Sequence, residues 1–247
     1  MCTVTYIPSN SGFFLTSNRD EHIDRGQALA PLVYYNGKDE LLCPKDPKGG
    51  SWVAAKDNGD VVVLLNGAFV KHVVLPWYRK SRGLILLDII SAERPERYYQ
   101  GLNLDGIEPF TLILYTSGKL YECRWDGGKK WMTAINSRRA HIWSSATLYD
   151  KIAAAKHKNW FELWRQFGAQ RTTLTIMDFH RYGGHGDPKD SLVIDRDGKM
   201  KTMSITNIHV RFEQLTMTYH DIMDDRRYIS ELQVTRTKGK VKPKECF

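Results

Sequence analysis

The first 21 residues decide the fold, and they read MCTVTYIPSNSGFFLTSNRDE from Met1 to Glu21. Residues 2–7 are rich in β-formers, residues 9–12 (SNSG) are turn formers, and residues 13–17 resume the β pattern. This order predicts a hairpin with Cys2 at the outer end of its first strand. A polar tetrad at 18–21 closes the second strand, so we expect it to lie beside Cys2.

Cys2 is the first candidate for chemistry, because a small second residue permits removal of the initiating methionine. Without Met1, Cys2 would carry both a thiol and a free α-amine, whose ordinary pKa of about 7.7–8.0 lets it accept the thiol proton. Nucleophile and base would then share one residue, and the natural reaction is acyl transfer through a thioester. The competing interpretation is that Cys2 is an incidental small residue.

The tetrad Asn18-Arg19-Asp20-Glu21 supplies charged and polar partners for such a nucleophile. Asp20 would hold or orient the α-amine, and Arg19 would stabilise the thiolate. We expect Asn18 and Glu21 to contact the substrate. The competing interpretation is a hydrophilic turn after a strand.

Beyond the hairpin, the sequence predicts strands with a few packing helices. The turn dipeptide Asn58-Gly59 indicates a second hairpin, between strands at 51–55 and 61–65. Helices are expected at 81–92, ended or broken at Pro95, and at 147–167, with a Thr147/Asp150 capping pair and Gly168 as the C-terminal cap. Further strands are expected at 110–116, 120–125, 131–135, 191–194, 201–208 and 210–219. This grouping is typical of a single α+β domain of layered sheets over residues 1–234, followed by a basic, disordered tail at 235–247.

Several blocks resemble the NRDE family, which is named for the tetrad and includes the transport and Golgi organisation protein 2 group. The matching blocks are Met1-Cys2, the tetrad at 18–21, Arg25, Gly49–Trp52 and the strand end at 64–66 (LLN). A weaker likeness extends through Asn136-Ser137 and residues 191–205. The resemblance covers most of the chain except the tail.

The NRDE family in turn resembles the cysteine N-terminal-nucleophile hydrolases, such as bile salt hydrolases and penicillin V acylases. That resemblance implies a four-layer αββα sandwich and hydrolysis of a non-peptide amide. It implies that Cys2 is the nucleophile, that Asp20 contacts its amine, that Asn66 binds the oxyanion and that Asn136 contacts the amine or the intermediate. Asn66-Gly67 is also a turn dipeptide, so a purely structural role for Asn66 stays open.

Two departures from the hydrolase pattern concern arginines. Those enzymes place an arginine before the strand-end asparagine, whereas here Arg19 follows Asn18, so Arg19 could point elsewhere than at the thiol. They also carry a second arginine late in the chain, and the sequence does not choose between Arg181 and Arg196.

Two functions follow from these residues. The first is a cysteine N-terminal-nucleophile amidohydrolase of a small acylated metabolite, which needs no cofactor. The second is a non-enzymatic carrier of haem or a lipid-like metabolite on the same fold. In either function, we expect Trp52 to pack beneath the nucleophile or against the ligand. The two glycines before Ser51 would let the strand start close to Cys2.

Charge, hydropathy and cysteine spacing bear on the other classes of function and on the location of the protein. The formal net charge is +8, partly from the tail, which weakly favours an anionic substrate, but no nucleic-acid-binding motif is present. No apolar run approaches the roughly 18 residues of a membrane-spanning helix, and the N-terminus does not read as a signal peptide, so a cytoplasmic protein is expected. The four cysteines have no metal-ligand spacing and read as free thiols. His180, His185 and Asp187 match no standard metal site, and their glycine-rich stretch reads as a flexible loop or a flap over the pocket.

Overall fold

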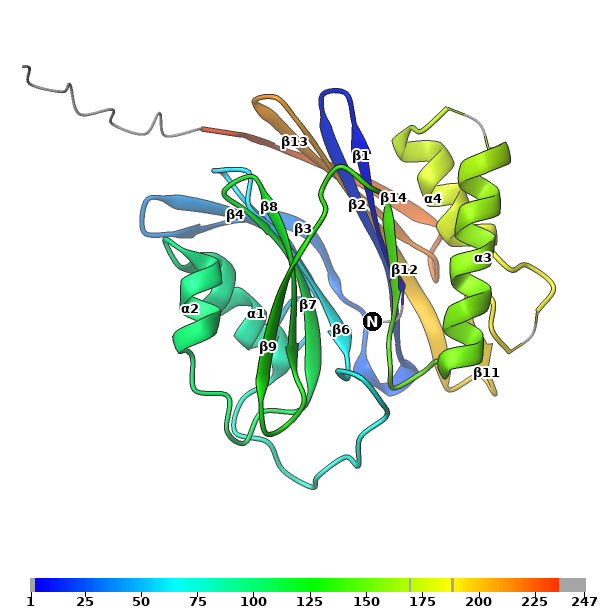
Figure 1. The fold of residues 1–247 in the computed structure, drawn as a ribbon, viewed down its shortest axis with the longest axis horizontal. Helices are drawn as coiled ribbons and strands as arrows, with labels where there is room; N and C mark the ends of the chain where they lie inside the picture. The colour runs from blue at the N-terminus through cyan, green and yellow to red at the C-terminus, as the bar shows by residue number, and fades with distance from the viewer. Residues whose placement is uncertain (1–2, 169, 188, 236–247) are drawn as a thin grey trace, which may run out of the picture.

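The chain folds into two antiparallel sheets stacked face to face, with two helices on the outer face of each sheet (Figure 1). The structure is a computed structural model that describes residues 3–168, 170–187 and 189–235. Its layers follow the order helices, sheet, sheet, helices, which is the expected αββα sandwich.

The first sheet contains the N-terminal hairpin at its centre. Its strand order is β10-β1-β2-β12-β13-β14, with the short β11 paired to β12. The strands are β1 (Thr3–Ser9), β2 (Gly12–His22), β10 (His141–Ser144), β11 (Asp195–Arg196), β12 (Met200–Arg211), β13 (Gln214–Asp221) and β14 (Arg226–Gln233).

The second sheet follows chain order, β3 to β9, because each strand pairs with the next. Its strands are β3 (Leu29–Asn36), β4 (Asp39–Lys45), β5 (Val53–Lys56), β6 (Val61–Asn66), β7 (Phe110–Thr116), β8 (Lys119–Trp125) and β9 (Lys130–Ile135). A single turn of 3-10 helix (Ile23–Arg25) leads from the first sheet into the second.

In the described residues, four helices cover the two outer faces. Helices α1 (Arg82–Ser91) and α2 (Pro95–Gly101) pack on the second sheet, and α3 (Lys151–Phe167) and α4 (Thr173–Tyr182) pack on the first (Figure 1). The Ser81 hydroxyl accepts a hydrogen bond from the Leu84 N–H, so Ser81 is the N-cap of α1.

Apolar side chains fill the space between the layers. The largest cluster lies between the sheets, where Val4 and Leu15 of the first sheet meet Val63 of the second. Successive strand residues point to opposite faces. Accordingly Ile7 and Phe14 face outward, against Phe161 of α3 and the residues of α4. Both faces of β1 and β2 are therefore buried.

Several elements differ from the sequence expectation. The helix expected at 147–167 begins at Lys151, because Asp150 itself is the N-cap and accepts hydrogen bonds from the N–H groups of Ile152 and Ala153. Pro95 starts α2 rather than ending a helix, since proline suits the first turn. Residues 191–194 form no strand. Helix α4 and the strands β3, β4, β10 and β14 were not expected.

The expected tail falls almost wholly outside the described residues. Thr235, its first residue, donates its backbone N–H to the Asp57 carbonyl at 2.7 Å, so at this position the chain is still attached to the second sheet. Across the described ranges, every helix is too short or too polar to cross a bilayer.

Candidate active site

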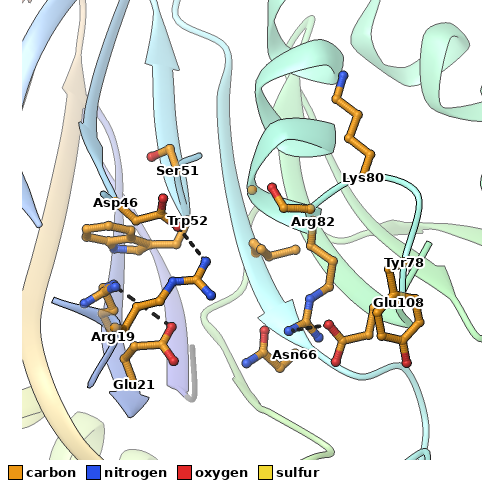
Figure 2. Close-up of a pocket in the computed structure, with 14 residues that line it drawn as sticks. Arg19, Glu21, Asp46, Ser51, Trp52, Asn66, Tyr78, Lys80, Arg82 and Glu108 are labelled. Carbon is orange, nitrogen blue, oxygen red and sulfur yellow. Dashed lines mark hydrogen bonds and ion pairs between the residues drawn. The ribbon is translucent and has the colours of Figure 1, made fainter. Parts of the chain in front are cut away.

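A polar cavity of about 310 Å³ opens beside the end of β2, where the two sheets and the start of α1 meet. Four residues singled out from the sequence line it: Arg19, Glu21, Trp52 and Asn66. Figure 2 shows two groups of side chains that face each other, with Asn66 lying between them. The cavity therefore gathers residues from segments far apart in the chain.

Arg19 is the most enclosed charge of this cavity, with only 3% of its surface exposed. Its guanidinium stacks over the Trp52 ring, 4.6 Å from the centroid, and lies 3.9 Å from the Glu21 carboxylate. Burial lowers the pKa of Arg19, and Glu21 partly offsets that effect, but a guanidinium stays protonated at neutral pH. Its Nη1 has no hydrogen-bond partner among the described residues. Such a buried donor is suited to an anion.

The other charges of the cavity are paired. Arg25 donates a hydrogen bond to Asp46 at 2.9 Å, and Arg82 lies 3.0 Å from Glu108 on the opposite wall (Figure 2). Burial lowers the pKa of Arg82 as well. Since both pairs are internally neutral, Arg19 is the cation least compensated by its neighbours.

Asn66 ends β6 and directs its side chain into the cavity (Figure 2). Its backbone carbonyl accepts a hydrogen bond of 2.8 Å from the hydroxyl of Ser145, the residue that follows β10. This bond ties the end of the second sheet to the strand that flanks β1 in the first. The backbone of Asn66 is thus fixed, while its amide remains available to a ligand.

Gly67 forms the turn that follows Asn66 at the end of β6. Its φ of +78° is in the left-handed region, and an added Cβ would lie 2.9 Å from Thr147 Cγ2. We expect Gly67→Ala to lower the free energy of unfolding by about 2–4 kcal/mol, from backbone strain plus overpacking. Urea unfolding measures this change.

The matched control is Gly118→Ala, because Gly118 has a similar φ of +75° with no atom within 4 Å of an added Cβ. Gly118→Ala should lower the free energy of unfolding only by the cost of backbone strain, about 1–2 kcal/mol. Equal losses for the two variants would mean that the contact with Thr147 relaxes freely.

Asp20 lies on the face of β2 opposite to Arg19, as strand alternation requires. It is 2% exposed, and its Oδ1 accepts a hydrogen bond of 2.6 Å from the Thr202 hydroxyl on β12. Thr202 Oγ1 in turn accepts the Ile194 N–H at 2.9 Å. A chain of hydrogen bonds therefore holds the Asp20 carboxylate against β12, which pairs with β2 on the side away from β1.

The structure does not bring Asn18 to the cavity. Its amide nitrogen donates to the carbonyls of His180 and Leu192, and its Oδ1 lies 2.5 Å from His180 Nδ1. All these partners belong to the outer layer around α4. Asn18 faces away from the cavity because it lies two residues before Asp20 and therefore on the same face of β2. The hydrogen bonds of its amide connect α4 to the sheet.

His180 completes this buried contact in its neutral form. Because Asn18 Oδ1 can only accept, the ring proton is on Nδ1, and Nε2 accepts from the Thr5 hydroxyl at 2.8 Å. Burial lowers the pKa of His180 to about 3. Above pH 6.5 the folded and unfolded chains are both neutral at this residue, so its contribution to stability is fully present there.

Below pH 6.5 the unfolded chain binds a proton that the folded chain excludes, so stability falls with pH until about pH 3. We expect the wild-type protein to lose about 2 kcal/mol more than His180→Gln between pH 7 and pH 5, at 1.36 kcal/mol per pKa unit. Urea unfolding at both pH values tests this expectation. Equal losses would show that His180 does not govern acid stability.

Asn136 lies at the wrong end of the sheet for its expected role. Strands β1 and β10 are antiparallel, with Thr3 opposite Ser144 and Tyr6 opposite His141. Asn136 precedes β10, and its carbonyl lies 2.8 Å from His141 Nε2. It is therefore near the far end of β1, while Ser144 and Ser145 lie at the end where the chain starts.

Cys2 lies outside the described residues, and so does Met1. The next residue, Thr3, is fully buried in the middle of the first sheet, opposite Ser144 of β10. On the other side of β1, Val4 pairs with Ser17, one residue before the tetrad. The start of β1 is thus enclosed between the strand carrying Arg19 and the strand leading to Ser145.

A second, larger cavity of about 690 Å³ lies on the β10 side, and Ser144, Thr147 and Phe69 are among its lining residues. Arg196 also lines it, with hydrogen bonds to the carbonyls of Leu148 and Lys189. Arg181 instead lies 3.4 Å from Asp225 on the outside of α4. Neither late arginine lines the first cavity.

The glycine-rich stretch after α4 does not gather metal ligands. His180 bonds Asn18 and Thr5, whereas Asp187 bonds Lys156 at 2.9 Å. Over the ranges that the structure describes, no three His, Cys, Asp or Glu side chains are grouped as a metal site.

Sequence reasoning missed several residues of the site. Arg82, Glu108, Lys80 and Tyr78 line the cavity from two loops and a helix start, where spacing carries no signal for a pocket. Ser145 and Thr202 act through hydrogen bonds to Asn66 and Asp20. A strand alignment that placed Ser145 beside the N-terminus would have found the first of these.

The layer order and sheet topology define an N-terminal-nucleophile hydrolase-like fold. Two solved structures share it: penicillin V acylase from Agrobacterium tumefaciens (TM-score 0.58, 9% identity, 93% of this chain and 85% of that chain) and a variant of conjugated bile acid hydrolase from Clostridium perfringens (TM-score 0.52, 11% identity, 93% and 92%). The chain belongs to the Transport and Golgi organisation 2 family, whose pattern matches residues 1–175. This confirms the resemblance noted from the tetrad. A search of curated proteins found no match.

Proposed function

We propose that the protein is a cysteine N-terminal-nucleophile hydrolase that cleaves a non-peptide amide of a small acylated metabolite. The observation that carries the proposal is the surroundings of β1. Its buried first described residue, Thr3, directly follows Cys2 and lies between the strands leading to Arg19 and Ser145. The polar cavity at the end of β2 contains Arg19 and Asn66, and Ser145 bonds the Asn66 carbonyl. The two structural neighbours, an acylase and a bile acid hydrolase by name, have the same fold.

In the proposed reaction, the α-amine of Cys2 takes the thiol proton and the sulfur attacks the amide carbonyl carbon. The Asn66 amide and a backbone N–H donate hydrogen bonds to the oxyanion. The C–N bond breaks as the α-ammonium gives its proton to the leaving amine, which leaves a thioester. Water then attacks the thioester carbonyl carbon while the α-amine takes its proton. The C–S bond breaks, the α-ammonium returns the proton to the sulfur, and the acid is released. Asp20 orients the α-amine throughout.

The charge of the cavity supports an anionic group on the substrate. Arg19 is buried and stacked on Trp52, and its Nη1 lacks a partner among the described residues. A carboxylate or phosphate bound there would satisfy that donor. The free, buried thiols of Cys43 and Cys123 support a reducing compartment such as the cytosol.

The second candidate is a non-enzymatic carrier of haem or a lipid-like metabolite. The larger cavity favours it, because at about 690 Å³ it would hold a bulkier ligand beside Phe69 and Trp143. In that case the ligand would bind without forming an acyl-enzyme.

Intact-protein mass spectrometry separates the two. The full chain in a Cys246→Ser background is treated with p-nitrophenyl acetate, and its mass is compared before and after. We expect a starting mass lacking one methionine and the gain of one acetyl group, which Cys2→Ala abolishes. Burial raises the pKa of Cys43 to about 11 and of Cys123 to about 12, so those thiols should stay unmodified.

Retained Met1, or acetylation that is unaffected by Cys2→Ala, would overturn the hydrolase mechanism. Tight binding of haem or a fatty acid without acetylation of Cys2 would favour the carrier instead.

A further inference from the structure

The loop that connects β6 to α1 is unusual in length and position. Residues 67–81 form neither helix nor strand, whereas most connections in compact domains have about 4–6 residues. In Figure 1 this loop, drawn in cyan, extends below both sheets and away from the body of the molecule. Loops of this size without secondary structure usually serve a function.

The loop exposes a cluster of large apolar side chains. Val73 is 85% exposed and Trp77 is 70% exposed, and four more large apolar side chains are more than half exposed, those of Phe69, Val70, Val74 and Leu75. Single exposed apolar residues are ordinary, but a contiguous group of them marks an interaction surface. We call residues 69–77 the apolar loop.

The apolar loop is held outward by its own anchors. His72 Nε2 lies 3.1 Å from Glu108, the Leu75 N–H donates to the Tyr78 hydroxyl at 2.9 Å, and the Arg79 N–H donates to the Gly106 carbonyl at 2.8 Å. The His72 and Arg79 contacts tie the loop to residues 106–108, and the Leu75–Tyr78 bond closes a turn within the loop, whereas the apolar side chains remain exposed. The exposure is therefore a property of a fixed conformation.

Basic and aromatic residues surround the apolar side chains. Residues 69–80 contain three basic residues, Lys71, Arg79 and Lys80, and no acidic residue. Next to the loop, the Trp131 ring packs edge-on against Phe69 at 5.7 Å, and the Lys129 ammonium lies 4.1 Å above the Trp131 ring. Aromatic rings with basic neighbours are typical of surfaces that enter the headgroup region of a bilayer.

We propose that the apolar loop docks the protein on the surface of an anionic phospholipid bilayer. Leu75 and Trp77 would enter the boundary between headgroups and acyl chains, and Lys71 would contact anionic headgroups. Lys80 is paired with Asp88, whereas Lys71 is in no ion pair among the described residues. The positive charge of Lys71 favours such a membrane over a second copy of this chain, whose formal net charge is also +8. Tyr78 and Lys80, just past the loop, line the polar cavity, so docking would bring that cavity to the membrane.

Vesicle sedimentation tests this proposal on the full chain. The vesicles contain phosphatidylcholine alone or with phosphatidylserine. We expect the wild-type protein to bind the phosphatidylserine vesicles and Leu75→Ser/Trp77→Ser to bind them about tenfold or more weakly. The matched control is Phe167→Ser/Ile229→Ser, which removes two apolar side chains of similar exposure, 75% and 70%, elsewhere on the surface and should bind as the wild type does.

Two charge-reversal variants test the contribution of Lys71 to membrane binding. Lys71→Glu should weaken binding to phosphatidylserine vesicles severalfold, whereas Lys158→Glu on α3 changes the net charge equally and should have little effect. All variants keep the basic C-terminal segment, so it cannot account for a difference between them. Acetylation of Cys2 should be unchanged in all of them, which separates this proposal from the proposed function.

Three results would overturn the proposal. The first is absence of wild-type binding to either kind of vesicle. The second is an equal loss of binding in the loop pair and the control pair. The third is a dimer in sedimentation velocity that dissociates in the loop pair while vesicle binding is retained, which would assign the apolar loop to a second copy.

Discussion

Replacing Asn66 by alanine is expected to slow acetylation of Cys2 by about a hundredfold to a thousandfold, the usual loss for one oxyanion donor. On the proposed mechanism the Asn66 amide donates to the oxyanion. Only the backbone of Asn66 has a structural contact with Ser145, and alanine retains it. The variant should therefore unfold at nearly the wild-type urea concentration. Release of p-nitrophenolate in a single turnover measures the rate.

Asn58 provides the matched control for this substitution, because it also lies at an end of β6, in the turn from β5. Its side chain bonds Asp60 twice, so Asn58→Ala should lower stability and leave acetylation unchanged. A wild-type rate in Asn66→Ala would instead support the turn-residue interpretation of Asn66-Gly67.

Replacing Asp20 by asparagine is expected to slow acetylation of Cys2 by about a hundredfold or more, within the range for an impaired acid–base group. Asparagine has the same shape and can still accept the Thr202 hydrogen bond, but it lacks the negative charge that would hold the α-amine. The rate is measured as for Asn66→Ala, and thermal unfolding checks that the fold persists.

Thr202→Val separates the charge of Asp20 from its placement. It removes the hydrogen bond to Asp20 and leaves the Ile194 N–H without this acceptor, so we expect a loss of about 1–3 kcal/mol in stability. Acetylation should slow less than tenfold, because the carboxylate remains. If Asp20→Asn is acetylated at the wild-type rate, the buried carboxylate serves folding alone.

The tetrad shows what the sequence could and could not predict. Its position at the end of the hairpin was predicted, and β2 does run through it as far as His22. Four consecutive polar residues suggested one site, but strand alternation sends Arg19 and Glu21 to the cavity and Asn18 and Asp20 to the opposite face. The sequence does not show this division, because both faces of β2 are buried and the usual polar and apolar alternation is absent.

Asn136 and α4 differ from the sequence expectation for separate reasons. The role of Asn136 came from the family resemblance alone, whereas the antiparallel register places Ser144, and not Asn136, at the start of β1. The expected glycine-rich loop began at His180, but α4 extends to Tyr182. The buried Asn18–His180 contact that locks α4 to the sheet joins residues 162 positions apart, and no local pattern reports it.

The pairing of β2 with β12 has a consequence for synthesis on the ribosome. Asp20 and Thr202 are separated by 182 residues, so one edge of the nascent N-terminal hairpin stays open until residues 200–211 emerge. At roughly 5–20 residues per second this delay lasts on the order of ten to forty seconds. During that time β2 presents unpaired backbone N–H and C=O groups along this edge, which can pair with another strand. A stalled or truncated nascent chain would present the tetrad without the strand that positions Asp20, so only a nearly finished polypeptide can assemble the reactive centre.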